Sequence, residues 1–330
     1  MKNVLCFGEL LLRMSPTLQQ HWLQESTMPF YVGGAELNVA QALAKWKMPV
    51  KYCTALPDNY LAHEISDYLK EKGVDTSAIK YSGNRIGLYF LPQGADLKHN
   101  SVIYDRTHSS FAMLQPGTLN WDEILTNVNW LHFSAICPAI DSNIAAVCEE
   151  MLIIAASKKI TISVDLNYRA KLWKWGKSPV EVMKPLVQYC DVVMANIWSA
   201  NTLLGIDVDE HIHEKGRKEV YVEHAFKTGK KMMELFPKCK TVANTFRFER
   251  GDGIEYYATF QQQNEYVSKE FYSDCIVDKA GSGDCFMAGL IYGLKNGLDP
   301  QYIVDLAASA AFGKLHEKGD STQQEIKTIN

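Results

Sequence analysis

Short apolar segments of strand length alternate with amphipathic segments of helix length along this chain of 330 residues. In the helical segments apolar residues lie three or four positions apart, as Leu37, Ala40 and Leu43 do. Parallel strands need long crossover connections, which are usually helices. The alternation therefore predicts an α/β fold, a doubly wound and mostly parallel sheet in an αβα layering. We expect strands at 4–7, 51–55, 130–134, 160–165, 191–195 and 241–245, and helices at 36–46, 59–71, 144–157, 180–189 and 285–294.

Two stretches, residues 11–32 and 84–106, interrupt this alternation with short strand-like runs and turns but no helix. We predict that they form a small additional β-sheet, a lid. Its exposed edges suit it to cover a ligand or to pair with a second subunit, so we expect a homo-oligomer through the lid. Plain surface hairpins are the alternative. Residues 1–330 are expected to form a single domain, and the polar tail from residue 317 is expected to fray.

The overall composition excludes several functional classes. A net charge of −4 argues against a nucleic-acid partner, because binding along phosphates requires a positive excess. No segment reaches the roughly 18 to 20 apolar residues that span a bilayer, so we expect no membrane partner. The apolar run at the N-terminus is too short for a signal peptide, and the eight cysteines form no CxxC pair. These features indicate a cytoplasmic protein with reduced thiols.

The most specific local signal is the segment 278–284, DKAGSGD, which directly precedes a strongly apolar helix. A glycine-rich turn at a helix N-terminus directs several backbone N–H groups into one small volume, which favours a phosphate. Asp284 would face the same volume and could take a proton from a hydroxyl that attacks phosphorus. The alternative is that Asp284 only caps the helix.

Other phosphate-binding loops are absent from the sequence: it contains no GxxxxGK[ST] segment and no GxGxxG after the first strand. A second glycine-containing signal is GGAELNVA at residues 33–40. Gly34 lets the backbone approach a ligand closely, and Asn38 on the first turns of the following helix could bind a polyol. A tight turn with close helix packing is the alternative.

The two segments GGAELNVA and DKAGSGDCFMAG together resemble the two signatures of the PfkB, or ribokinase-like, carbohydrate kinases. The resemblance covers essentially the whole chain. It implies a ribokinase-like αβα core with a β-lid, ATP-dependent phosphorylation of a sugar hydroxyl, and Mg²⁺ with the nucleotide; a monovalent-cation requirement is left open. It also implies that Asp284 is the catalytic base and that Gly281, Ser282 and Gly283 form the anion hole and contact ATP.

A third segment, DLNYRAKLW at residues 165–173, resembles the 2-keto-3-deoxygluconate kinases within this family. A sugar acid carries a carboxylate, which a guanidinium can bind through two hydrogen bonds. Arg106 and Arg169 are therefore candidates for that role, and Tyr89 and Tyr104 could offer hydroxyls to the sugar. A lid salt bridge for Arg106, a structural bond for Arg169 and aromatic cover for the tyrosines are the alternatives.

Two positions differ from the family pattern. Arg13 stands where relatives that act on neutral sugars carry an aspartate, which counts against a neutral sugar. Ser199 stands where the family carries the glutamate of its Asn-x-x-Glu motif, although Asn196 is retained as a candidate ATP contact.

Three further residues are weaker candidates. Thr245 and Arg247 could contact ATP phosphates, with a plain β-turn at residues 251–253 as the alternative. Asp320 is a candidate substrate contact, and an exposed tail carboxylate is the alternative.

The resemblance predicts a kinase that transfers phosphate from ATP to the C6 hydroxyl of 2-keto-3-deoxygluconate, giving 2-keto-3-deoxy-6-phosphogluconate. Its partners would be a small sugar acid and ATP. A fructokinase or another PfkB-type sugar kinase is the alternative enzyme. A non-catalytic sugar- or nucleotide-binding regulator on the same fold is the alternative from another class, favoured only by Ser199.

Overall fold

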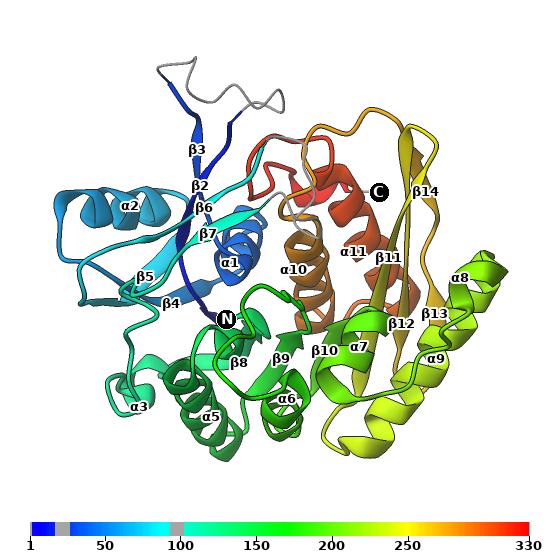
Figure 1. The fold of residues 1–330 in the computed structure, drawn as a ribbon, viewed down its shortest axis with the longest axis horizontal. Helices are drawn as coiled ribbons and strands as arrows, with labels where there is room; N and C mark the ends of the chain where they lie inside the picture. Colours follow the sequence, from blue (N-terminus) through cyan, green and yellow to red (C-terminus); the bar gives the residue numbers. More distant parts are fainter. Residues whose placement is uncertain (1, 17–26, 93–101, 330) are drawn as a thin grey trace.

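The computed structural model describes residues 2–16, 27–92 and 102–329, and its ribbon shows a central sheet between two layers of helices (Figure 1). The main sheet has ten strands in the order β13-β12-β11-β10-β9-β8-β1-β4-β5, with β14 paired to β12. The strands are β1 (Asn3–Phe7), β4 (Val50–Leu56), β5 (Val74–Tyr81), β8 (Val128–Ser134), β9 (Thr161–Asp165), β10 (Val192–Ala195), β11 (Thr241–Arg250), β12 (Gly253–Gln261), β13 (Glu265–Val267) and β14 (Phe271–Ser273).

The strand order creates a switch point beside β1. All pairs from β5 to β11 are parallel, and the later strands β12, β13 and β14 pair antiparallel at one edge. The chain continues from β1 to β4 and β5 on one side, and later from β8 to β11 on the other. Ligands of such sheets bind beyond the carboxyl ends of strands near this reversal. The predicted α/β class with a doubly wound, mostly parallel sheet is confirmed.

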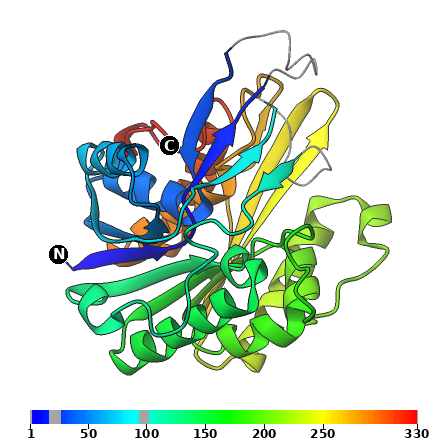
Figure 2. The ribbon, with the colours of Figure 1, turned by 60° about the vertical axis from the view of Figure 1, so that its left-hand side comes forward.

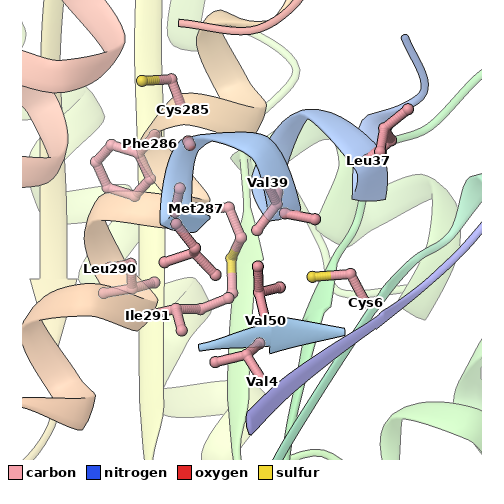
Figure 3. Close-up of a cluster of buried hydrophobic side chains, with 14 of the residues drawn as sticks. Val4, Cys6, Leu37, Val39, Val50, Cys285, Phe286, Met287, Leu290 and Ile291 are labelled. Atoms are coloured by element: carbon pink, nitrogen blue, oxygen red, sulfur yellow. The ribbon is translucent and has the colours of Figure 1, made fainter. Parts of the chain in front are cut away.

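The helices bury apolar side chains against both faces of the sheet. One core joins α1 and α10 to β1 and β4, as Figure 3 shows for Leu37, Val39, Met287, Val4 and Val50. The opposite core lies beneath α5, α6 and α7. The helices are α1 (Ala35–Lys45), α2 (Tyr60–Glu71), α3 (Trp121–Ile124), α4 (Ile136–Ile140), α5 (Ser142–Ser157), α6 (Pro179–Val187), α7 (Ile197–Leu204), α8 (Ile212–Lys215), α9 (Lys218–Leu235), α10 (Ser282–Lys295) and α11 (Pro300–Lys314), followed by a short 3₁₀ turn, Ile326–Thr328.

A second sheet of four strands rises away from the main sheet in both ribbon views (Figures 1 and 2). Its order is β3-β2-β6-β7, where β2 pairs parallel with β6 and the other two pairs are antiparallel. The strands are β2 (Leu11–Met14), β3 (Phe30–Gly33), β6 (Gly87–Phe90) and β7 (Ile103–Asp105). They fall within the two stretches predicted to form the lid, except that β3 continues one residue further, to Gly33. Residues 17–26 and 93–101 of those stretches lie outside the described residues.

One sequence-based expectation is wrong. The tail does not fray as a polar extension, because Asp320, Thr322 and Ile329 are buried. A plain turn does follow Arg250, where β11 continues directly into β12. Among the described residues no helix is both long and apolar enough to cross a membrane.

Candidate active site

A cavity of about 460 Å³ lies between the lid, the carboxyl ends of the parallel strands and the start of α10. Lid residues such as Tyr89 and Tyr104 line it together with Asp165 at the end of β9 and Met194 in β10. The cavity brings together every residue that the sequence singled out for a site: Gly34, Asn38, Tyr89, Tyr104, Arg106, Arg169, Asn196, Thr245, Arg247, Gly281, Ser282, Gly283, Asp284 and Asp320.

The N-terminus of α10 opens onto this cavity. Gly281 is its N-cap residue and has a positive φ of 78°. A Cβ at Gly281 would lie only 1.7 Å from the carbonyl oxygen of Asp320, so the turn requires glycine here. The first backbone N–H groups of a helix have no partner within the helix, and the helix dipole adds positive potential there. This end of α10 is suited to hold an anion.

Asp284 lies on the first turn of α10 and is largely buried in the cavity wall. Its Oδ2 accepts a hydrogen bond of 2.7 Å from Nδ2 of Asn38 on α1, so the side chain is fixed by another helix and does not cap its own. Burial raises the pKa of Asp284 to about 7, although the Asn38 hydrogen bond opposes that shift. A carboxylate with such a pKa can accept a proton near neutral pH.

The α1 end of the cavity depends on a second glycine. Gly34 is the N-cap residue of α1 with φ of 137°, and a Cβ there would lie 2.3 Å from the carbonyl oxygen of Glu9. The backbone at Gly34 can therefore pass close to Glu9 and start the helix that carries Asn38. This packing places Asn38 against Asp284.

Asp165 is a cavity-lining carboxylate that is not among the site residues predicted from the sequence. It ends β9, is 8% exposed on the cavity wall, and its carboxylate forms no hydrogen bond or ion pair with any described residue. Burial, together with the charge of Asp284, raises the pKa of Asp165 to about 8. Its position at the carboxyl end of a predicted parallel strand was the signal that could have identified it.

Arg106 lies directly after β7 and is paired within the protein. Its Nε donates a 2.7 Å hydrogen bond to Oε2 of Glu9, and its Nη2 contacts the same oxygen. Ser109 also donates to Glu9. The alternative of a salt bridge at the lid thus describes Arg106 in this structure, although its side chain still lines the cavity.

Arg169 lies on the loop that follows β9 and is partly exposed to the cavity. Its one hydrogen bond is a 3.1 Å contact from Nη1 to the carbonyl oxygen of Tyr168, and it has no carboxylate partner among the residues placed by the structure. Its charge lowers the pKa values of Asp165 and Asp284, against the larger effect of burial. The guanidinium is therefore available to an anionic ligand.

Asp320 is buried rather than exposed, at 3% of its surface, because Arg13 and Tyr89 from the lid meet it there. Nε of Arg13 lies 2.6 Å from Oδ1 of Asp320 as an ion pair rather than an aligned hydrogen bond, and the Tyr89 hydroxyl donates to Oδ2 at 2.5 Å. Arg13 also binds Asp278, just before the glycine-rich turn, at 2.6 Å. The sequence around Arg13 indicates no contact for it, and the structure shows that it joins the lid to this turn.

The opposite end of the cavity contains the candidate ATP contacts. Asn196 is the N-cap residue of α7, and its side chain accepts a hydrogen bond from the Ser199 N–H at 2.8 Å. The Ser199 hydroxyl accepts a hydrogen bond from the Asn196 N–H at 3.0 Å, so serine closes a capping box where the resemblance implies a glutamate. Thr245 and Arg247 lie on β11, and Nη1 of Arg247 donates to the carbonyl oxygen of Lys279 at 3.4 Å. The cavity therefore has one carboxylate fewer at this end than the family pattern implies.

Comparisons with known proteins identify the family of this chain. The profile described as "pfkB family carbohydrate kinase" matches residues 1–327. The crystal structure of 2-dehydro-3-deoxygluconokinase from Thermotoga maritima is 33% identical, with a TM-score of 0.89 over 100% of this chain and 98% of that one.

Two curated proteins are also similar. The 2-dehydro-3-deoxygalactonokinase of Haloferax volcanii is 28% identical over 207 residues, 63% of this chain and 64% of that protein, so the match leaves about a third of that protein uncovered. The 5-dehydro-2-deoxygluconokinase of Geobacillus thermodenitrificans is 26% identical over 88% of this chain and 81% of its own length. With the family profile matching nearly the whole chain, this protein belongs to the pfkB family of carbohydrate kinases and is an ATP-dependent sugar kinase.

Proposed function

We propose that this kinase phosphorylates 2-keto-3-deoxygluconate at its C6 hydroxyl and releases 2-keto-3-deoxy-6-phosphogluconate. The observation that carries the proposal is the guanidinium of Arg169, which lines the cavity without a carboxylate partner among the described residues. A guanidinium binds a carboxylate through two parallel hydrogen bonds, which distinguishes a sugar acid from a neutral sugar. The names of the three relatives, each a kinase of a dehydro-deoxy sugar acid, support the same class.

The remaining polar groups of the cavity suit the rest of such a substrate. Tyr89 and Tyr104 from the lid, with Gly34 and Asn38 from the start of α1, can bind the keto and hydroxyl groups. Arg106, which Glu9 holds in place, can contribute a second guanidinium to the binding of the substrate carboxylate.

In the proposed reaction Asp284 accepts the proton of the C6 hydroxyl while that oxygen bonds to the γ-phosphorus, and the bond from γ-phosphorus to the bridging oxygen of ATP breaks. The amides of Gly281, Ser282 and Gly283 stabilise the negative charge on the phosphoryl oxygens. Asn38 keeps the Asp284 carboxylate oriented through its 2.7 Å hydrogen bond. Orientation and electrostatic stabilisation supply most of the rate in such transfers.

The residues of the cavity also fit ATP and Mg²⁺. Lys279, Arg247 and the α10 N-terminus provide donors and positive potential for phosphates. Mg²⁺ prefers oxygen ligands, and the unpartnered Asp165 carboxylate is the candidate that the chain offers for it. ATP supplies the phosphoryl group, and Mg²⁺ would neutralise part of its charge.

We also propose that the lid forms the contact of a homo-oligomer. Phe30 and Ile103, on the edge strands β3 and β7, are 55% and 53% exposed. Apolar edge strands tend to be covered by a partner. Sedimentation of the wild type beside a Phe30→Lys, Ile103→Lys variant tests this: the variant should sediment as a smaller species, and an unchanged assembly would exclude the lid.

A coupled kinase assay tests the substrate. The wild type should prefer 2-keto-3-deoxygluconate over fructose. The galactose-derived epimer of 2-keto-3-deoxygluconate is assayed beside it. Arg169→Ala should raise KM for the sugar acid by about tenfold to a hundredfold, because a hydrogen-bonded charge pair contributes about 1.5–3 kcal/mol. If fructose is the best substrate of the wild type, the carboxylate argument is wrong.

A further inference from the structure

Lys314, the last residue of α11, is a fully buried lysine directly behind the N-terminus of α10. It is 0% exposed. Its Cε would lie 3.4 Å from a Cβ placed on Gly281. A charge on its side chain therefore lies close beneath the turn where the phosphoryl group is proposed to bind.

The ammonium of Lys314 has few partners for a buried charge. It donates one hydrogen bond, of 3.2 Å, to the carbonyl oxygen of Glu317, and it forms no ion pair with a carboxylate in the described part of the chain. Burial lowers the pKa of Lys314, and the nearby charges of Asp278, Glu317 and Asp320 oppose that shift. A buried charge with so few partners destabilises a fold, and an apolar residue of similar size would be more stable. Its presence therefore indicates a use other than stability.

The surrounding charges show what that use is. Asp278 and Asp320 share the single guanidinium of Arg13, which leaves one negative charge unbalanced beside the turn. A protonated Lys314, whose Cε lies beside Gly281, would supply a compensating positive charge. Without that ammonium, the γ-phosphoryl group would meet a net negative charge behind the backbone amides that are to bind it.

We propose that Lys314 is a positioning residue for phosphoryl transfer, whose ammonium neutralises the carboxylates behind Gly281 and favours negative charge at the N-terminus of α10. This inference rests on the proposed role of residues 281–283 as the anion hole. It does not depend on which sugar is the substrate.

The experiment uses Lys314→Met in the full-length enzyme, since methionine is close to lysine in shape and has no charge. The kcat/KM for ATP should fall by about tenfold to a hundredfold. The sugar dissociation constant, measured by calorimetry without ATP, should change by less than about twofold, because Lys314 does not line the cavity. This limit corresponds to about 0.4 kcal/mol. Lys295→Met is the matched control. Lys295 is the last residue of α10, as Lys314 is of α11, and burial lowers its pKa too. Unlike Lys314, it lies away from the turn at Gly281, and it does not line the cavity.

Chemical rescue distinguishes the charge from the packing. Ethylammonium should raise the turnover of Lys314→Ala in a saturable way, whereas tetramethylammonium at the same concentration should not. Lys314→Met should not respond, because its side chain fills the space.

Three results would overturn the proposal: Lys314→Met within about twofold of the wild type, equal losses for sugar and ATP, or no response of Lys314→Ala to ethylammonium. The Asp284→Asn variant separates the two hypotheses. If it retains turnover, the assignment of the site itself fails; if it is inactive while Lys314→Met is active, only the role of Lys314 fails.

Discussion

Replacing Asp284 with asparagine should abolish most turnover and at the same time stabilise the protein. The change is nearly isosteric, and the amide oxygen introduced at this position can still accept the hydrogen bond that Asn38 donates at 2.7 Å. Loss of a general base lowers the rate by about a hundredfold to ten-thousandfold. Sugar binding, measured without turnover, should be largely unchanged because the shape of the cavity remains.

The stability gain follows from the pKa of this carboxyl. Burial raises it from 3.8 to about 7, so the folded state holds this proton more tightly than the unfolded state does. Stability from this group is fully present below pH 3.8 and is lost as the pH rises through about 7. A difference of roughly three pKa units corresponds to at most about 4 kcal/mol at pH 8.

Urea unfolding at several pH values measures this effect. Asp284→Asn should be more stable than the wild type at pH 8, and the difference should disappear near pH 4. Asp67→Asn, at an exposed carboxylate paired with Lys70, is the control for removing a negative charge from the surface. In the same series, kcat/KM of the wild type should fall about tenfold per pH unit below pH 7. A variant that is active and no more stable than the wild type at pH 8 would refute the assignment.

Three other substitutions have defined outcomes. Gly281→Ala should lower the free energy of urea unfolding by at least about 2 kcal/mol and reduce turnover, because the added Cβ would lie 1.7 Å from the Asp320 carbonyl oxygen. An unchanged free energy of unfolding would contradict the close approach of these two backbone segments. Arg13→Met should cost about 3–5 kcal/mol in urea unfolding, since Asp278 and Asp320 lose their shared partner; a cost below about 1 kcal/mol would show that the ion pairs do not stabilise the fold. Arg169→Ala should leave KM for neutral sugars unchanged while raising it for sugar acids, and equal effects on both would remove the carboxylate contact.

Patterns confined to one segment were predictable from the sequence. The apolar run before Asp165 places this carboxylate at the end of a strand, and the glycine-rich segment around Gly281 places backbone N–H groups at the start of a helix. Neither placement depends on residues far away in the sequence. Both features lie where the sequence indicated, and the two lid stretches contain strands β2, β3, β6 and β7.

Features that depend on distant partners were not predictable. The strand continues past residue 245 to Arg250 because β11 pairs with β12 from Val242 opposite Gln261 to Arg250 opposite Gly253. Asp320 is buried because Arg13 and Tyr89, from two other strands, meet it. Nothing near residue 320 in the sequence indicates these partners, so a polar tail was the natural expectation.

The cavity wall contains several buried carboxylates. Its buried carboxylates are those of Glu9, Glu36, Asp165, Asp284 and Asp320. Burial raises the pKa of the last four, so each of them lowers stability when it is ionised. Selection for stability alone would replace such groups with apolar ones. Local departures from the rules of core packing are expected where chemistry requires them. The destabilising carboxylate of Asp284 is therefore expected to be retained for its role in turnover.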